Sequence, residues 1–331
     1  MSRASSRADY RLGSVYALAT AVLYSVQEPF SFLAASRLST IQFVCLTQIA
    51  LFLSIPLVTF NRASRRDFLA LLRTPTNYGR LAAVFAIGMT GLLLYNVGLK
   101  EAHPIIVSAV LNLLPFWAAL VALIIARVPI PVSLTVFFGC FAGAFLGALA
   151  VAWSQIADAD QQSLDALARS LLRGGWVYAL PVPICTALGG TLIAKWFGRY
   201  DEGAAIASNF LFANVLLIPT TLVVLDRRGE VFFNGQVLAI ALMIVGTIIA
   251  ASVGRVVFQI ALTVTQGDNG FVSMFLNLVP ALTALISFAM SWAIPALHFG
   301  FDARFFVGLA LIGASLVLFS LKATQTPAAR A

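Results

Sequence analysis

Two charged side chains inside apolar stretches are the first candidates for chemistry in this sequence. Glu28 and Arg255 are the charged residues that fall clearly within runs long and apolar enough to cross a bilayer. Burying a charge in a membrane is costly, so such residues usually mark a transport pathway or a counter-ion. A carboxylate can hold an ammonium group or carry a proton, whereas a guanidinium can hold a carboxylate.

Polar neighbours extend each charge into one face of a helix, because side chains three or four positions apart lie on the same side. Tyr24 and Gln27 share a face with Glu28, and Ser252 and Gln259 share a face with Arg255. These two faces are therefore predicted to point into a protein interior or a water-filled cavity.

A third polar candidate, Thr186, lies in an apolar run that Pro181, Pro183, Gly189 and Gly190 interrupt. Transporters expose backbone groups to ligands where a membrane helix is broken. The alternative interpretation is the ordinary use of Pro and Gly in membrane helices.

A short stretch that occurs twice organises the chain. Val107 to Pro115 reads V-S-A-V-L-N-L-L-P, and Val272 to Pro280, half a chain length later, reads V-S-M-F-L-N-L-V-P. Each proline removes a backbone donor, which predicts a helix kink beside a polar face at mid-membrane. The alternative is a packing motif in which the asparagine bonds to a neighbouring helix. The shared polar and kink positions are Ser108, Asn112 and Pro115, then Ser273, Asn277 and Pro280.

The similarity between the two halves extends beyond this motif. Met89 to Leu99 reads M-T-G-L-L-L-Y-N-V-G-L, and Ser252 to Leu262 reads S-V-G-R-V-V-F-Q-I-A-L. Tyr95 and Asn96 thereby correspond to Phe258 and Gln259. Five spans per copy is an odd number, so the second copy must be inverted relative to the first. Inverted repeats of this kind are characteristic of secondary transporters, which bind substrate near the midplane between the repeats.

The composition is that of a polytopic membrane protein. Hydrophobic residues make up 60% of the 331 residues and charged residues 10%, against roughly 45–50% and about 25% in soluble domains. The formal charge of +8 resides in short gaps between apolar runs, which indicates an orientation signal and not a nucleic-acid surface. We predict an all-α fold with ten transmembrane helices, at residues 12–34, 39–60, 80–99, 104–126, 132–153, 175–197, 206–225, 237–262, 270–295 and 303–322.

The repeat and the longest gap divide the chain into four parts. Residues 1–153 form the first five-helix repeat, residues 154–173 an outside linker, residues 174–323 the second, inverted repeat, and residues 324–331 a tail. Apolar positions on one face of the linker favour a short helix on the membrane surface, although a plain linker fits equally well. Basic residues in the amino-terminal tail and the 61–80 loop predict cytoplasmic termini, in a multi-pass protein of the plasma (inner) membrane.

The same residues carry a resemblance to a known family. Tyr95 to Leu99, Val107 to Pro115, and their echoes at Phe258 to Leu262 and Val272 to Pro280 resemble the ten-helix EamA-type members of the drug/metabolite transporter superfamily. The resemblance covers residues 12–322 and implies a central cavity lined by the first, third, fourth, sixth, eighth and ninth helices. It also implies metabolite export in many members. Phosphate-handling relatives use clustered basic residues on late helices, and this chain has only Arg255 there, which argues against a phosphorylated substrate.

The depth of Arg255 in the membrane has two estimates. Counting ~1.5 Å per residue from residue 237 places it about 27 Å from the outer face, near the inner interface. The repeat equates Arg255 with Leu92 and places it just past the midplane, and we follow the repeat. The alternative is that the long side chain reaches the inner interface.

On the repeat-based register, Glu28 and Arg255 differ in depth by about 6–12 Å. That offset suits a small zwitterion, such as an amino-acid-like metabolite, with its carboxylate on Arg255 and its ammonium on Glu28. Alternatively, Glu28 carries a proton that couples transport to a proton gradient, because removal from water favours the neutral carboxyl. The residues expected to contact the substrate are Tyr24, Gln27, Glu28, Tyr95, Asn96, Ser108, Asn112, Thr186, Ser252, Arg255, Gln259, Ser273 and Asn277.

A membrane-embedded enzyme, a channel and a receptor are the competing functions. The sequence has no nucleophile elbow, no metal-ligand spacing and no phosphate loop, no filter-like segment, and loops too short for a receptor's output surface. We therefore predict a secondary transporter of a small polar metabolite in the lipid bilayer, an exporter by family analogy. No cofactor, metal or nucleic-acid partner is expected, and the protein would act as a monomer or homodimer.

Overall fold

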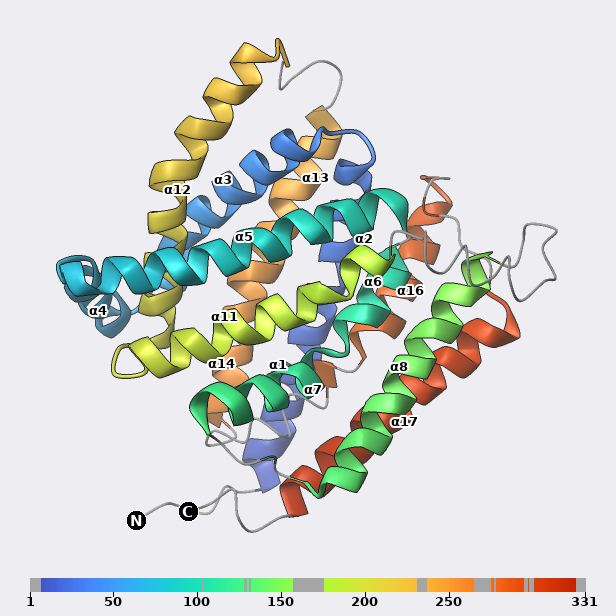
Figure 1. Cartoon of the computed structure of the whole chain (residues 1–331). Coiled ribbons are helices and arrows are strands. Elements are labelled where there is room, and N and C mark those ends of the chain that lie inside the picture. Colours follow the sequence, from blue (N-terminus) through green and yellow to red (C-terminus); the bar gives the residue numbers. More distant parts are fainter. Residues whose placement is uncertain are drawn as a thin grey trace.

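The computed structural model describes residues 7–102, 104–127, 130, 132–156, 176–230, 237–264, 275–276, 278–294, 297 and 301–325. Within these residues the chain is helical and contains no strand. The helices pack side by side in one bundle (Figure 1). Most of the expected linker at 154–173 lies outside the described residues.

The elements of the first half are α1 (Arg7–Ser25), α2 (Gln27–Ala35), α3 (Thr40–Val58), α4 (Arg62–Leu72), the 3-10 turn η1 (Pro75–Asn77), α5 (Tyr78–Glu101), α6 (Pro104–Leu111), α7 (Leu114–Val121), the π-helical turn η2 (Ala122–Ala126) and α8 (Leu134–Ile156). Those of the second half are α10 (Trp176–Ala179), α11 (Pro181–Phe197), α12 (Glu202–Arg227), α13 (Val237–Ile248), the π-helical turn η3 (Ile249–Gly254), α14 (Arg255–Val264), α16 (Val279–Ser291) and α17 (Ala303–Gln325).

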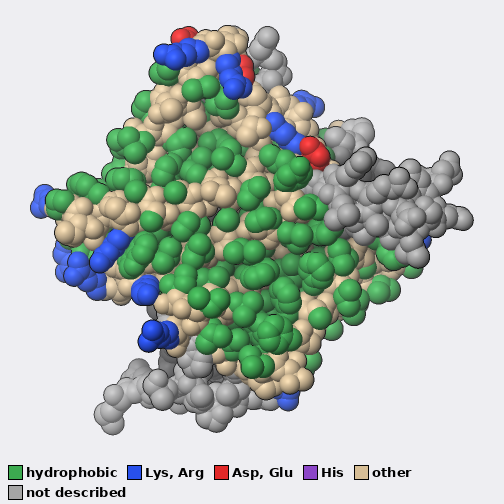
Figure 2. Space-filling model, viewed as in Figure 1, with side chains coloured by type: hydrophobic (Ala, Val, Ile, Leu, Met, Phe, Trp, Pro, Cys, Tyr) green, Lys and Arg blue, Asp and Glu red, His purple; other side chains and the backbone are tan. Residues whose placement is uncertain are grey.

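Seven helical segments in the described residues are long and apolar enough to cross a membrane, and they correspond to the second to eighth predicted spans. They are Thr40–Val58, Pro75–Glu101, Pro104–Ile125, Leu134–Val151, Trp176–Phe197, Glu202–Arg227 and Val237–Phe258. On the face in Figure 2, hydrophobic side chains cover the middle and most Lys and Arg side chains lie towards the edges. Apolar sides with charges at the ends are what a bilayer requires. The chain is therefore a membrane-embedded helical protein.

A proline breaks the first predicted span. The sequence predicts one helix over 12–34, whereas α1 ends at Ser25 and α2 begins at Gln27. Pro29 has no N–H, so the carbonyl of Ser25 loses its helical donor. Thr283 of α16 donates a hydrogen bond to that carbonyl at 3.3 Å. A neighbouring helix thus satisfies the backbone at the break, as an apolar surrounding demands.

Prolines also stand at the two predicted kinks. α6 ends at Leu111 and α7 begins at Leu114, with Pro115 in its first turn. α16 begins at Val279, with Pro280 in its first turn. Proline is tolerated there because the first N–H groups of a helix have no helical acceptor.

α8 and α17 pack closely along their length. A Cβ atom at Gly147 would lie 2.6 Å from the carbonyl oxygen of Gly308, and a Cβ at Gly308 would lie 2.6 Å from that of Gly147. Larger side chains would therefore push the two helices apart. Phe116 of α7 joins this pair, with ring centroids 5.9 Å from Phe137 and 5.1 Å from Phe319.

α3 and α12 are joined at both ends by hydrogen bonds between residues far apart in the sequence. Ser39, the N-cap of α3, donates to Glu230 beyond the end of α12 at 2.5 Å. Asp201, the N-cap of α12, accepts from Ser64 of α4 at 2.5 Å. The N-cap of each helix therefore bonds to the chain just beyond the carboxyl end of the other.

Candidate functional site

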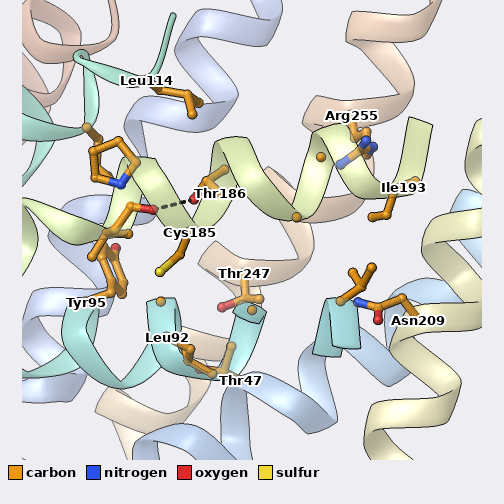
Figure 3. A pocket seen from close by; sticks show the side chains of 18 of the residues that line it. Thr47, Leu92, Tyr95, Leu114, Cys185, Thr186, Ile193, Asn209, Thr247 and Arg255 are labelled. Atoms are coloured by element: carbon orange, nitrogen blue, oxygen red, sulfur yellow. Dashed lines mark hydrogen bonds between the residues drawn. The ribbon is translucent and has the colours of Figure 1, made fainter. Parts of the chain in front are cut away.

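A cavity of about 830 Å³ lies between the helices of the two halves. Its described lining comes from α2, α3, α5, α6, α7, α11, α12, α13 and α14. Tyr95 lies at one end of the view in Figure 3 and Arg255 at the other, with α11 running between them. The volume falls within the range of small-molecule sites, ~300–1,000 Å³.

One end of the cavity holds a buried acid. Glu28 is 6% exposed and accepts a hydrogen bond from the Tyr95 hydroxyl at 2.7 Å. The ring of Phe43 lies 6.5 Å from that of Tyr95, and Leu38 and Leu99 are buried in the same apolar cluster. Apolar side chains therefore close the cavity beyond the carboxylate, which we call the closed end.

The other end, which we call the mouth, holds an exposed ion pair. An Arg255 terminal nitrogen lies 2.6 Å from a carboxylate oxygen of Glu202, and the two side chains are 38% and 51% exposed. Glu202 is the first residue of α12, where the helix dipole favours an acid. Arg255 follows the π-helical turn η3, a distortion common at functional sites.

The mouth lies at the α4 end of the bundle, because α12 begins there and packs against α4. The Arg255 guanidinium therefore extends towards this end of the bundle, which agrees with the alternative that its long side chain reaches the inner interface. Val84 and Tyr95 line the cavity on the same helix, so it is at least about 16 Å long at ~1.5 Å per residue. Glu28 and Arg255 therefore lie towards opposite ends of this cavity, and their predicted offset of about 6–12 Å stays a prediction.

Two further predicted residues, Gln27 and Thr186, line the cavity. The Thr186 hydroxyl donates to the carbonyl of Val182 at 2.9 Å (Figure 3). Asn112 does not line the cavity; its amide nitrogen donates to the carbonyl of Ser108 at 2.7 Å. This asparagine bonds to its own helix, at the break before Pro115.

Other predicted residues lie outside the cavity lining. Tyr24 packs on Gly254, where a Cβ would lie 2.7 Å from its ring. Asn96, Ser108 and Ser252 are buried, and their side-chain polar atoms have no hydrogen-bond partner among the described residues. The Gln259 side chain, Ser273 and Asn277 lie outside the part of the chain that the structure describes.

The cavity also contains residues that the sequence reasoning missed. Thr47 of α3, Glu202 and Asn209 of α12, and Thr247 of α13 line it. α3 and α12, the second and seventh predicted spans, are outside the set of helices that the family resemblance implies. The sequence does contain a signal for Glu202. Asp201 followed by an acid is typical of a helix start, and it lies four residues before the predicted start of the seventh span at 206.

No group of three or more His, Cys, Asp or Glu residues in the described part of the chain could hold a metal ion. No protein family and no curated protein matches the sequence. A solved structure described as "Crystal structure of protein" is similar to this chain, with a TM-score of 0.54 and 15% identity. The match covers 95% of this chain and 99% of that one. At this identity the likeness concerns the fold alone.

Proposed function

We propose that this chain is a secondary transporter that exports a small polar metabolite by alternating access. The observation that carries the proposal is the cavity with a mouth at Arg255 and Glu202 and a closed end at Glu28 and Tyr95. A site between two halves, reached from one side and closed on the other, is one of the two states that alternating access requires.

Helix packing supports ten spans in two inverted repeats as part of this proposal. In two inverted repeats each helix has a counterpart in the other half: α5 corresponds to α14, and α11 corresponds to α1. The contact of α5 with α11 then has its equivalent in the contact of α14 with α1, and both contacts are present. Likewise α7 corresponds to α16, and the contact of α7 with α11 has its equivalent in the contact of α16 with α1. α3 and α12 are counterparts of each other, as are α8 and α17, and the two helices of each pair are in contact. This pattern fits a two-fold axis in the membrane plane.

The α4 end is the cytoplasmic side in this proposal, because arginines are concentrated there. Both termini are then cytoplasmic, in a plasma or bacterial inner membrane, and the mouth faces the side from which an exporter loads. Single cysteines at Ala63 and Ser36, both in exposed positions, test the arrangement. They should react with an impermeant maleimide from opposite sides; reaction from one side would refute the topology.

An amino-acid-like zwitterion is the substrate class that the charges favour. The exposed Arg255–Glu202 pair contributes little stability, so a substrate carboxylate can replace Glu202 at the mouth with little loss. The ammonium group then reaches Glu28 at the closed end. Arg255 at the mouth therefore meets the substrate before Glu28 at the closed end does.

Transport by purified protein in proteoliposomes tests the role of Glu28. The wild type should give saturable flux, which separates it from a channel, and should release substrate unchanged, which separates it from an enzyme. Glu28→Gln should abolish substrate binding if the carboxylate holds the ammonium. If Glu28 only couples protons, the variant should still exchange substrate but lose pH-driven accumulation.

Glu101→Gln is the matched control, because Glu101 is exposed at the end of α5 and does not line the cavity. It should transport as the wild type does. Full binding and full accumulation in Glu28→Gln would refute both roles for this carboxylate.

A further inference from the structure

α4 has two different faces. Arg62, Arg65, Arg66 and Leu69 are exposed and spaced as one side of a helix. Ser64 and Leu71 are buried on the opposite side, where Asp67 is partly buried. The helix therefore presents a basic surface to its surroundings and holds to the bundle by its other face.

Few carboxylates of the described residues neutralise this basic surface. Arg62, Arg73 and Arg80 are exposed and have no carboxylate partner among the described residues. Asp67 lies 3.1 Å from Arg66 but also accepts the backbone N–H of Asp201 at 3.0 Å. Lys and Arg side chains gather at the left edge of Figure 2, where Figure 1 places α4.

Exposed apolar side chains stand among these arginines. Leu69 is 50% exposed and Tyr78 is 44% exposed. α4 directly follows the membrane-spanning α3 and precedes the span that begins at Pro75, so it lies at the level of the membrane surface. Arginines mixed with apolar and aromatic side chains at that level are the composition of a helix that rests in an anionic lipid interface.

The buried face of α4 contacts the elements that form the mouth. Ser64 donates to Asp201, which caps α12. Leu71 is fully buried in a small cluster with Phe197 and Ala205. Both of those residues line the cavity. A force on α4 therefore acts on the start of α12 and the end of α11.

We propose that Arg62, Arg65, Arg66, Leu69, Arg73, Tyr78 and Arg80 form a docking surface for the headgroups of an anionic phospholipid leaflet. Lipid bound there holds α4 and, through Ser64, Asp67 and Leu71, sets the position of the mouth. The lipid acts because it binds one arrangement of the mouth better than others. This role does not depend on the chain being a transporter.

Thermal unfolding of the purified protein in neutral detergent tests the docking. Phosphatidylglycerol should raise Tm, because a ligand of the folded state stabilises it, and phosphatidylcholine at the same concentration should not. The rise should shrink at ~1 M salt, where charges are screened beyond about 3 Å. An equal rise with phosphatidylcholine would refute a charge-selective surface. An equal rise with glycerol phosphate would mean that a free anion, and not a leaflet, is the ligand.

The variant Arg62→Gln/Arg73→Gln/Arg80→Gln should lose at least half of the phosphatidylglycerol-dependent rise. The matched control is Arg37→Gln/Arg227→Gln/Arg228→Gln, which removes three exposed arginines at the other end of the bundle and should keep the rise. Equal losses in the two variants would place the lipid elsewhere. If the first variant does not fold, Arg62→Gln alone should still lose part of the rise that the wild type shows, and an unchanged rise would count against the surface.

The effect of bound lipid on the mouth can be measured separately, through the reactivity of the native Cys185, which lines the cavity. Phosphatidylglycerol should change its rate of reaction with a water-soluble maleimide by about twofold or more. Ser64→Ala/Asp67→Asn should keep the rise in Tm but lose the change in rate. An unchanged rate in the wild type would refute the coupling and leave the docking intact.

Discussion

Each end of the cavity holds an acid that accepts a short hydrogen bond, but the two acids differ in burial. Glu28 accepts from Tyr95 at 2.7 Å and is 6% exposed. Glu202 accepts from Arg255 at 2.6 Å and its side chain is 51% exposed. A buried group that loses its partner costs about 1–3 kcal/mol, whereas an exposed ion pair contributes about 0–1 kcal/mol. The two hydrogen bonds are similar in length, so the difference in burial is what makes the Glu28–Tyr95 contact costly to break and the Glu202–Arg255 contact easy to replace.

The largest effect is expected from Tyr95→Phe, which leaves the Glu28 carboxylate buried without its donor. The free energy of unfolding should fall by about 1–3 kcal/mol, seen as a lower Tm. Tyr78→Phe is the control, because the Tyr78 hydroxyl also donates one bond, to Leu72, but is exposed. Equal losses in the two variants would show that burial does not separate the two ends.

A smaller effect is expected from Glu202→Gln, which removes the charge from the exposed pair. Stability should change by less than about 1 kcal/mol. Substrate affinity at the mouth should rise for carboxylate-bearing molecules, since Arg255 no longer has a competing carboxylate. A loss of stability as large as that of Tyr95→Phe would make the mouth pair a structural contact.

Salt should separate the two ends further. Going from ~0.1 M to ~1 M salt shortens the screening length from about 10 Å to about 3 Å, which weakens exposed pairs more than buried ones. The Tm values of Glu202→Gln and the wild type should converge, while the gap between Tyr95→Phe and the wild type should persist. A gap that closes for both variants would contradict the assigned burial.

The smallest effect concerns a third acid, Asp67, which joins α4 to the mouth. The backbone N–H of Asp201 lowers the pKa of this carboxyl below its ordinary value, and Arg66 adds to the effect. A lowered folded-state pKa gives stability that is present above the ordinary Asp range, ~3.9, and is lost as the pH falls through the folded-state pKa. Asp67→Asn should thus be slightly less stable than the wild type at neutral pH and equal to it in acid. A constant gap across that range would remove Asp67 from the contact.

Local features of the fold could be predicted from the sequence, because their causes are local. Pro115 and Pro280 mark helix starts, since proline lacks the N–H that a helix interior needs. The same rule, applied to Pro29, would have found the break at Val26. α4 also has local signals that the prediction of a loop over 61–80 overlooks. Asn61 precedes it as an N-cap, and Ser64, Asp67 and Leu71 repeat at helical spacing.

Residues whose surroundings come from distant helices could not be placed in this way. Arg255 finds its partner on α12, which no spacing within α14 reveals. Asn112 was expected to face the cavity, but a short amide side chain competes for its own backbone and bonds to Ser108. Glu28 could be found because a charge in an apolar run is rare, whereas its donor Tyr95 comes from α5.

The two bonds that join α3 to α12 also bear on how the protein is made. Ser39 and Glu230 are 191 residues apart, and Ser64 and Asp201 are 137 residues apart. At a synthesis rate of ~5–20 residues per second, roughly 7–40 s pass between emergence of the first and second partner of such a bond. During that interval the Ser39 and Ser64 hydroxyls lack the carboxylate acceptors on Glu230 and Asp201 that they have in the folded protein. These two contacts of the second span therefore form only after the seventh span and the residue that follows it have been made.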